Sequence, residues 1–143
     1  MIETKTIHAV LTEANEKDSV EERIQVLQEN DSKVLRFVLQ MAFDDNVQTL
    51  LPDGEPPFNP VPKQDQVTLH AMESKLPSLF KYGPMSKAPA TKVEMFFIDM
   101  LSKLKKEEAN LLVYAKDKRL NVLFKKLTKN VVKKFFGDSV NIK

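Results

Sequence analysis

The sequence predicts an all-α fold, a single compact domain of about seven to eight short helices with a proline-rich central loop. Only 3 of the 143 residues are glycine, while leucine, lysine and glutamate, which favour helices, are frequent. Apolar residues recur three and four positions apart in both halves of the chain, as on one face of a helix. We therefore expect one domain with an acidic helical half (residues 1–50), a proline-rich connection (51–90) and a basic helical half (91–143).

Three short helices are expected in the acidic half. The first covers residues 6–15. Ser19 and Glu22 form a capping box, in which each side chain can accept a free backbone N–H, and this box opens a second helix that ends near Asn30. A third helix begins at Ser32. Their apolar positions are Ile7, Val10, Leu11 and Ala14 in the first, Val20, Ile24 and Leu27 in the second, and Val34, Leu35, Val38, Leu39 and Ala42 in the third.

The connection is interrupted by prolines. Residues 52–62 contain five of them, and because proline lacks an N–H and favours extended geometry before it, no helix continues there. A fourth, shorter helix is expected over Asp65–Lys75. We interpret the proline segment as a surface crossover that Phe58 and Phe80 hold against the core. The alternative is a binding loop, because long loops in compact domains are often functional.

The pattern of apolar residues predicts four helical segments in the basic half. Thr91 and Glu94 form a second capping box, and the helix that follows is expected to be the central helix of the core. Residues 105–116 form the next helix. The apolar positions of the four segments are Val93, Phe96, Phe97, Met100, Leu101 and Leu104, then Ala109, Leu112, Val113 and Ala115, then Leu120, Leu123, Phe124 and Leu127, and finally Val131, Val132, Phe135 and Phe136.

The last helix is amphipathic and basic. Thr128 is its expected cap and Gly137 its stop. At 100° per residue its apolar positions share one half of the helix, so Lys129, Asn130, Lys133 and Lys134 face solvent or a partner.

Charge is polarised along the chain. Residues 1–55 contain 5 basic and 12 acidic groups, residues 56–102 contain 5 and 4, and residues 103–143 contain 12 and 4. The formal net charge of +2 therefore hides an acidic start and a strongly basic end. A clustered basic surface attracts polyanions, of which nucleic acid is the commonest in a cell.

Several kinds of chemistry find no support in the sequence. There is no cysteine, and His8 and His70 stand apart from other ligand residues, so no metal is implied. Phosphate-cradling glycine loops and a nucleophile elbow are absent, and we expect no catalytic residue, no cofactor and no small-molecule substrate. The N-terminus lacks the pattern of a signal peptide and the longest purely apolar stretch, Met95–Ile98, cannot span a bilayer, so we expect a soluble cytoplasmic protein without a membrane partner.

Two blocks of sequence carry a pattern of helix caps and apolar positions over most of the chain. The first contains Ala14, Asn15, Ser19, Ile24, Leu27, Asn30, Leu35, Arg36, Val38, Ala42 and Phe43. The second runs from Leu123 to Gly137 through the Thr128 cap. Together they resemble the all-helical N-terminal DNA-binding domain of ATP-dependent DNA ligases, particularly those of T4-like phages. The resemblance implies that the second block lies at the DNA backbone.

The chain also departs from those ligases. Lys126 stands where they usually have glycine, Val122 where they usually have aspartate, and Leu51 in the place of the lysine of their K-x-D-G motif. The segment from Leu50 to Phe58 looks like a family of small proteins of T4-like phages, notably those that infect cyanobacteria. The resemblance therefore implies a stand-alone, phage-encoded protein without ligase activity, acting in the cytoplasm of the host cell.

We expect a non-enzymatic accessory protein that binds the phosphate backbone of duplex DNA without sequence preference, in replication, repair or transcription. The residues expected at the DNA are Lys125, Lys126, Thr128, Lys129, Lys133 and Lys134.

Three alternatives remain. One is a protein-binding adaptor or regulator that docks on a phage or host replication or transcription protein through its acidic helices or its proline-rich loop. Opposite charges at the two ends would also allow head-to-tail self-association that weakens in salt. Another is an enzyme built from scattered carboxylates. In the third, the lysine face is merely solvated.

Overall fold

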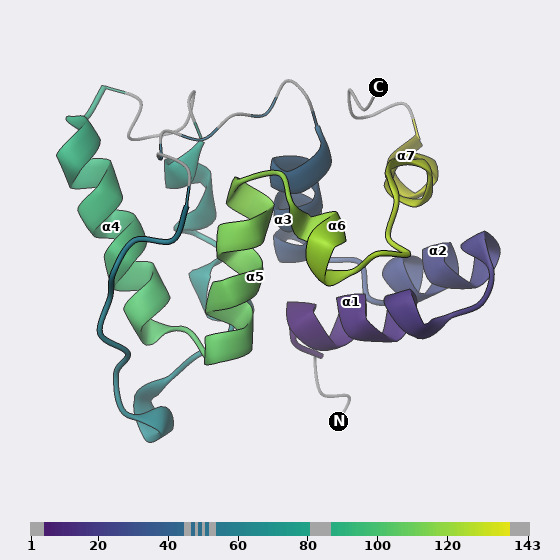
Figure 1. Ribbon diagram of the computed structural model, residues 1–143, viewed down its shortest axis with the longest axis horizontal. Helices are drawn as coiled ribbons and strands as arrows, with labels where there is room; N and C mark the ends of the chain where they lie inside the picture. Colours follow the sequence, from purple (N-terminus) through teal and green to yellow (C-terminus); the bar gives the residue numbers. More distant parts are fainter. Residues whose placement is uncertain are drawn as a thin grey trace.

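The computed structural model describes residues 5–44, 47, 49, 51, 54–80 and 87–137. Within these residues the chain forms seven α-helices, three short 3-10 helices and no β-strand (Figure 1). Two isolated backbone bridges, Thr49 with Phe80 and Val67 with Leu104, do not extend into a sheet. The all-α fold class expected from the sequence is confirmed.

The three helices expected in the acidic half are present. Their bounds are α1 (Ile7–Glu16), α2 (Val20–Glu29) and α3 (Lys33–Phe43). Each begins at a hydroxyl cap, because Thr6, Ser19 and Ser32 accept the backbone N–H of the third residue after them. At α2 the carboxylate of Glu22 accepts the Ser19 hydroxyl at 3.0 Å, so the two side chains of the capping box bond to each other.

The helix expected over Asp65–Lys75 does not form. Three 3-10 turns occupy this part of the chain, and they are η1 (Lys63–Asp65), η2 (Leu69–Met72) and η3 (Leu76–Leu79). The reason lies at Val67, whose N–H donates to the carbonyl of Lys103 at 2.8 Å and whose carbonyl accepts the N–H of Lys105 at 3.0 Å. Because these backbone groups bond to a distant segment, they cannot also continue a helix.

Four helices form the basic half. They are α4 (Ala90–Lys103), α5 (Lys106–Lys116), α6 (Leu120–Leu123) and α7 (Lys129–Phe136). The expected capping box of Thr91 and Glu94 is wrong, because α4 already begins at Ala90 and has no side-chain cap. Pro89 sits at the cap position, and its carbonyl accepts the N–H groups of Lys92 and Val93 in the first turn of the helix.

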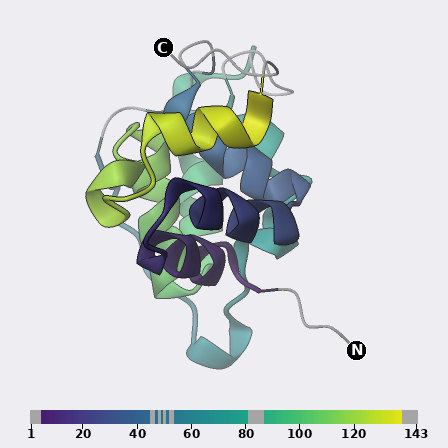
Figure 2. The same cartoon turned by 90° about the vertical axis from the view of Figure 1, so that its right-hand side faces the viewer.

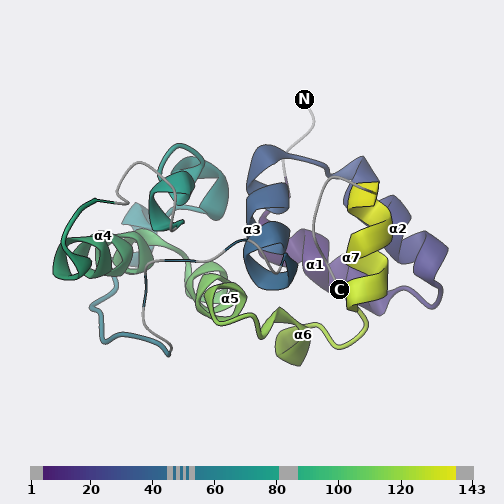
Figure 3. The ribbon, with the colours of Figure 1, turned by 90° about the horizontal axis from the view of Figure 1, so that it is seen from above.

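The central helix is α5. It packs against α1, α3 and α6, while α4 lies at one edge of the molecule and packs against η3 (Figure 1 and Figure 3). The expectation that α4 is the central core helix is therefore wrong. One face of α4 is buried through Val93, Phe97 and Met100, but Met95 on the same helix is 70% exposed. The apolar side chains of α4 therefore pack at an edge of the core, and some of them remain exposed to solvent.

The proline-rich segment lies against the basic half. Residues 55–62 contain no helix, and the N–H of Gly54 donates to the carboxylate of Asp117 at 3.0 Å. Phe58 and Phe80 are partly buried against the core, as the sequence predicts. Leu50, Pro52, Asp53, Gly83 and Pro84 lie outside the described residues.

Two charged side chains join the two halves of the chain. Glu108 is fully buried, and its carboxylate accepts the N–H of His8 at 3.0 Å and that of Leu69 at 3.1 Å. Lys118 donates to three carbonyls at the end of α3. Those carbonyls belong to Met41, Asp44 and Val47, at 2.9 to 3.0 Å. One hydrophobic cluster contains buried residues from both halves, so they share a core.

Candidate nucleic-acid interface

The basic helix α7 is fixed at both ends by its own sequence. The hydroxyl of Thr128 accepts the N–H of Val131 at 3.4 Å, which makes Thr128 the cap that the sequence predicts. The helix stops at Gly137, whose φ of +69° falls in the region that favours glycine. The predicted bounds of this helix are confirmed.

α7 packs against α2 and α3 (Figure 2 and Figure 3). Its buried residues are Val131, Val132, Phe135 and Phe136. Burial of side chains of this size contributes about 1.5–3 kcal/mol each, which suffices to hold a short helix that would be marginal alone. On the opposite face Lys129, Asn130, Lys133 and Lys134 are exposed, as expected.

Arg36 of α3 supports the end of α7. Its guanidinium lies 5.2 Å from the ring centre of Phe135 and 5.5 Å from that of Phe136. It also donates to both carboxylate oxygens of Asp31 at 2.7 Å. This hydrogen bonding lowers the pKa of Asp31 and raises the pKa of Arg36. The sequence pattern included Arg36 among the ligase-like positions but did not predict its contact with α7.

The turn before α7 is anchored on α1. The backbone N–H of Lys126 donates to the side-chain carbonyl of Asn15 at 2.8 Å. Phe124 is buried, with its ring centre 5.9 Å from that of His8. The N–H of Lys126, at the position where ligases usually have glycine, is therefore occupied within the protein. The side chains of Lys125 and Lys126 remain exposed.

The structure brings the five predicted lysines onto one helix and the turn that precedes it. We call them the lysine surface: Lys125, Lys126, Lys129, Lys133 and Lys134. All five are exposed, and none forms an ion pair within the described part of the chain. Lys5, Lys103 and Lys116, by contrast, each pair with a carboxylate. The lysine surface thus offers five ammonium groups without a protein counter-ion. Thr128, the sixth predicted residue, is also exposed but serves as the helix cap.

The acidic and basic halves do not form separate ends of the molecule. α7 packs side by side with α2, whose exposed carboxylates include Glu21, Glu22 and Glu29 (Figure 3). The expectation of opposite charges at two ends is therefore wrong, because the last helix folds back onto the first three. The lysine surface consequently has an acidic helix as its neighbour.

Other candidate chemistry is sparse. Within the described ranges no group of three or more His, Cys, Asp or Glu side chains is arranged to hold a metal ion. His70 bonds through Nε2 to the carbonyl of Lys5 at 2.9 Å, and His8 packs on Phe124, so the two histidines serve different parts of the fold. No helix in the described part of the chain is long and apolar enough to cross a membrane.

The model of a family of unknown function, DUF6433, matches residues 10–122. The chain belongs to this family. No curated protein and no solved structure matches the chain. The DUF6433 match extends from α1 into α6 and ends before Lys125, so the lysine surface lies outside the matched residues. Membership in the DUF6433 family therefore describes the body of the fold and leaves the basic helix to be interpreted from its own geometry.

Proposed function

We propose that the protein is a non-enzymatic accessory protein that binds the phosphate backbone of duplex DNA through the lysine surface. The observation that carries the proposal is the set of five exposed lysines without an ion-pair partner among the described residues, on a capped helix and an anchored turn. A cluster of ammonium groups neutralises phosphates and releases condensed counter-ions, which drives binding.

The start of α7 supplies a second kind of contact. The cap Thr128 accepts the N–H of Val131, while the N–H groups of Lys129 and Asn130 in the first turn have no acceptor within the described residues. Free N–H groups at a helix start, together with the helix dipole, favour a phosphate there. The phosphate of one nucleotide would lie at this start, with Lys133 and Lys134 about one to two turns further along the helix.

The chemistry of the surface favours backbone contacts over base readout. Lysine binds phosphate as a point charge, whereas the side chains that read base edges are mainly arginine, asparagine and glutamine. Asn130 is the one such side chain among the exposed residues of α7. We therefore propose binding without sequence preference. The resemblance to ligase DNA-binding domains of T4-like phages further suggests phage origin, a role in replication, repair or transcription, and a preference for nicked duplex.

Fluorescence anisotropy of a labelled duplex, nicked and intact, tests the proposal at about 50 and 200 mM salt. Five phosphate contacts give a slope of log affinity against log salt of about −4 to −5. The Lys129→Glu/Lys133→Glu variant should lose binding. Lys87→Glu/Lys92→Glu, which makes the same charge change on exposed lysines near and in α4, is the matched control and should bind nearly as the natural protein does. Equal losses in both variants, or no binding at low salt, would overturn the proposal.

A protein-binding adaptor is the second candidate, and the exposed carboxylates of α2 favour it. Glu21 and Glu29 form no ion pair within the described residues and could meet a basic partner on a replication or transcription protein. The variant Glu21→Lys/Glu29→Lys separates the two functions. If α7 binds DNA, this variant binds DNA more tightly, because the acids of its neighbouring helix are removed. If α2 binds a basic protein, the same variant loses that protein in a pull-down while Lys129→Glu/Lys133→Glu retains it.

A further inference from the structure

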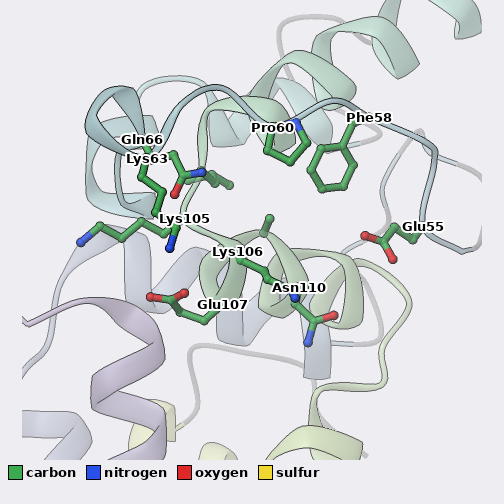
Figure 4. Close-up of a pocket in the computed structure, with 11 residues that line it drawn as sticks. Glu55, Phe58, Pro60, Lys63, Gln66, Lys105, Lys106, Glu107 and Asn110 are labelled. Atoms are coloured by element: carbon green, nitrogen blue, oxygen red, sulfur yellow. The ribbon is translucent and has the colours of Figure 1, made fainter.

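A cavity of about 990 Å³ lies between the proline-rich segment and the start of α5 (Figure 4). Phe58 and Pro60 form the wall on the side of the proline-rich segment, and α5 forms the opposite wall through Lys106 and Asn110. The volume lies at the upper end of the range of small-molecule sites. The cavity is lined by residues 55–66 and by residues 104–110 at the start of α5, and no residue of the lysine surface lines it.

One end of the cavity is cationic. Lys63 and Lys105 lie at that end, while the side chain of Lys106 runs along α5 toward Asn110 (Figure 4), and none of the three forms an ion pair within the described ranges. α5 also begins at this end of the cavity without a side-chain cap, so the positive end of its dipole lies near the two lysines. Two carboxylates line the cavity as well: Glu55 lies at the far end and Glu107 lies nearer the lysines. The cationic end therefore suits a phosphate, although the negative charge of Glu107 would repel a phosphate bound there.

The rest of the cavity suits a planar ring. Phe58 is only partly buried, and it lines the cavity beside Pro60. Nucleic-acid bases stack on aromatic side chains of this kind. Gln66 donates one amide hydrogen to the carbonyl of Val61 at 3.1 Å, which fixes the side chain at the wall. Asn110 is exposed, and its amide forms no hydrogen bond within the described residues, so it can pair with the edge of a base.

We propose that this cavity binds a phosphorylated nucleoside, with the phosphate at Lys63, Lys105 and the start of α5 and the base against Phe58. A cationic end, an aromatic wall and an amide side chain are the three groups that such a ligand requires. The ligand is either a free nucleotide or the terminal nucleotide of a single strand. The proposal departs from the expectation, drawn from the sequence, of no small-molecule ligand. It does not depend on duplex binding by the lysine surface.

Isothermal titration calorimetry of the full chain tests this site with four nucleoside monophosphates, adenosine and inorganic pyrophosphate as probes. At least one monophosphate should bind about tenfold or more tightly than adenosine and than pyrophosphate, because each of these lacks one of the two groups recognised. Lys63→Gln/Lys105→Gln should weaken that binding by about tenfold or more, while the matched control Lys87→Gln/Lys92→Gln leaves it unchanged. Glu107→Gln should strengthen it, because it removes the opposing carboxylate.

Three results would overturn the proposal: no monophosphate binds at millimolar concentration, pyrophosphate binds as tightly as the best monophosphate, or Lys63→Gln/Lys105→Gln binds normally. Phe58→Leu keeps an apolar side chain at the wall and should lose affinity for the monophosphate but not for pyrophosphate. A 5′-phosphorylated oligonucleotide, titrated in the Lys129→Glu/Lys133→Glu background, distinguishes the two sources. Tighter binding than the monophosphate identifies a strand end as the ligand, and weaker binding identifies a free nucleotide.

Discussion

The carboxylate of Glu108 holds two helix starts together. Its two oxygens accept the N–H of His8, in the first turn of α1, and the N–H of Leu69, at the start of η2. Groups at helix starts have no intrahelical acceptor, and in a buried position each needs one from elsewhere. Glu108 belongs to α5, so one buried side chain fixes three elements relative to one another.

Replacement of Glu108 by glutamine should destabilise the fold. The amide nitrogen of glutamine is a donor, so one of the two buried N–H groups would face another donor and lose its acceptor. The free energy of unfolding should fall by about 1–3 kcal/mol, and Glu108→Ala, which leaves both N–H groups without an acceptor, should lose more. Urea unfolding measures both. Glu107→Gln, one position away and exposed, is the control and should change stability by about 0.5 kcal/mol or less.

The pair of Asp31 and Arg36 should make stability depend on acid pH. The hydrogen bond with Arg36 lowers the pKa of Asp31 below its ordinary value of 3.8. The ionised pair therefore stabilises the folded state at pH values above 3.8, and this stabilisation is lost as the pH falls through the lowered pKa. The side chains are 43% exposed for Arg36 and 36% for Asp31, so the gain is about 1 kcal/mol or less.

Asp31→Asn should therefore lower stability at neutral pH and flatten its decline below about pH 4, measured by urea unfolding across a pH series. Arg36→Gln should flatten the same decline and lose more stability at neutral pH, because Arg36 also lies over the rings of Phe135 and Phe136. Parallel pH profiles for Asp31→Asn and the natural protein would contradict this account.

At the scale of elements, α7 depends on a single cap. Thr128→Ala removes the acceptor of the Val131 N–H, and such changes cost about 1 kcal/mol. The bond of 3.4 Å is long, so the loss should be at the lower end of the usual range. Thr128→Ser retains the hydroxyl and should behave almost as the natural protein does in thermal unfolding. An equal loss in both variants would mean that the threonine methyl group, and not the cap, is what matters.

The sequence predicted best those helices that begin at a side-chain cap only a few residues away. The hydroxyl caps at Ser19, Ser32 and Thr128 act on residues three positions away, so the sequence alone contains the interaction. The helix expected over Asp65–Lys75 failed because Val67 bonds to Lys103 and Lys105, which are almost forty residues distant. Thr91 failed as a cap because Pro89 before it already starts the helix.

For the site, the sequence predicted which residues are exposed but not what surrounds them. The face of α7 followed from its periodicity, and the lysines are exposed as expected. The supports of the lysine surface come from far away in the chain, since Asn15 holds the turn and Arg36 lies beside the end of α7. The cavity near α5 was missed for the same reason, because Phe58 and Lys105 become neighbours only through the fold.

At the scale of the whole molecule, the acidic and basic halves depend on each other. α7 covers α2 and α3, α5 packs against α1 and α3, and Lys118 bonds to three carbonyls at the end of α3. Removal of either half would expose apolar side chains that belong to one shared cluster. The change from acidic to basic sequence along the chain therefore does not separate two parts that would each be stable alone.

We accordingly expect the chain to unfold in one cooperative transition. Helix content, measured by far-UV circular dichroism, should give the same urea midpoint as the fluorescence of Tyr114 on the central helix α5, recorded with Tyr82, the other tyrosine of the chain, replaced by phenylalanine. Phe135→Ala tests the coupling, because it removes a buried ring from α7, which packs against α2 and α3. If the halves are coupled, the variant lowers the free energy of unfolding by about 3–5 kcal/mol, and the urea midpoints of both signals fall by the same amount. If circular dichroism alone shifts, or if the two signals separate in the natural protein, α7 is an independent layer and the lysine surface can detach without loss of the core.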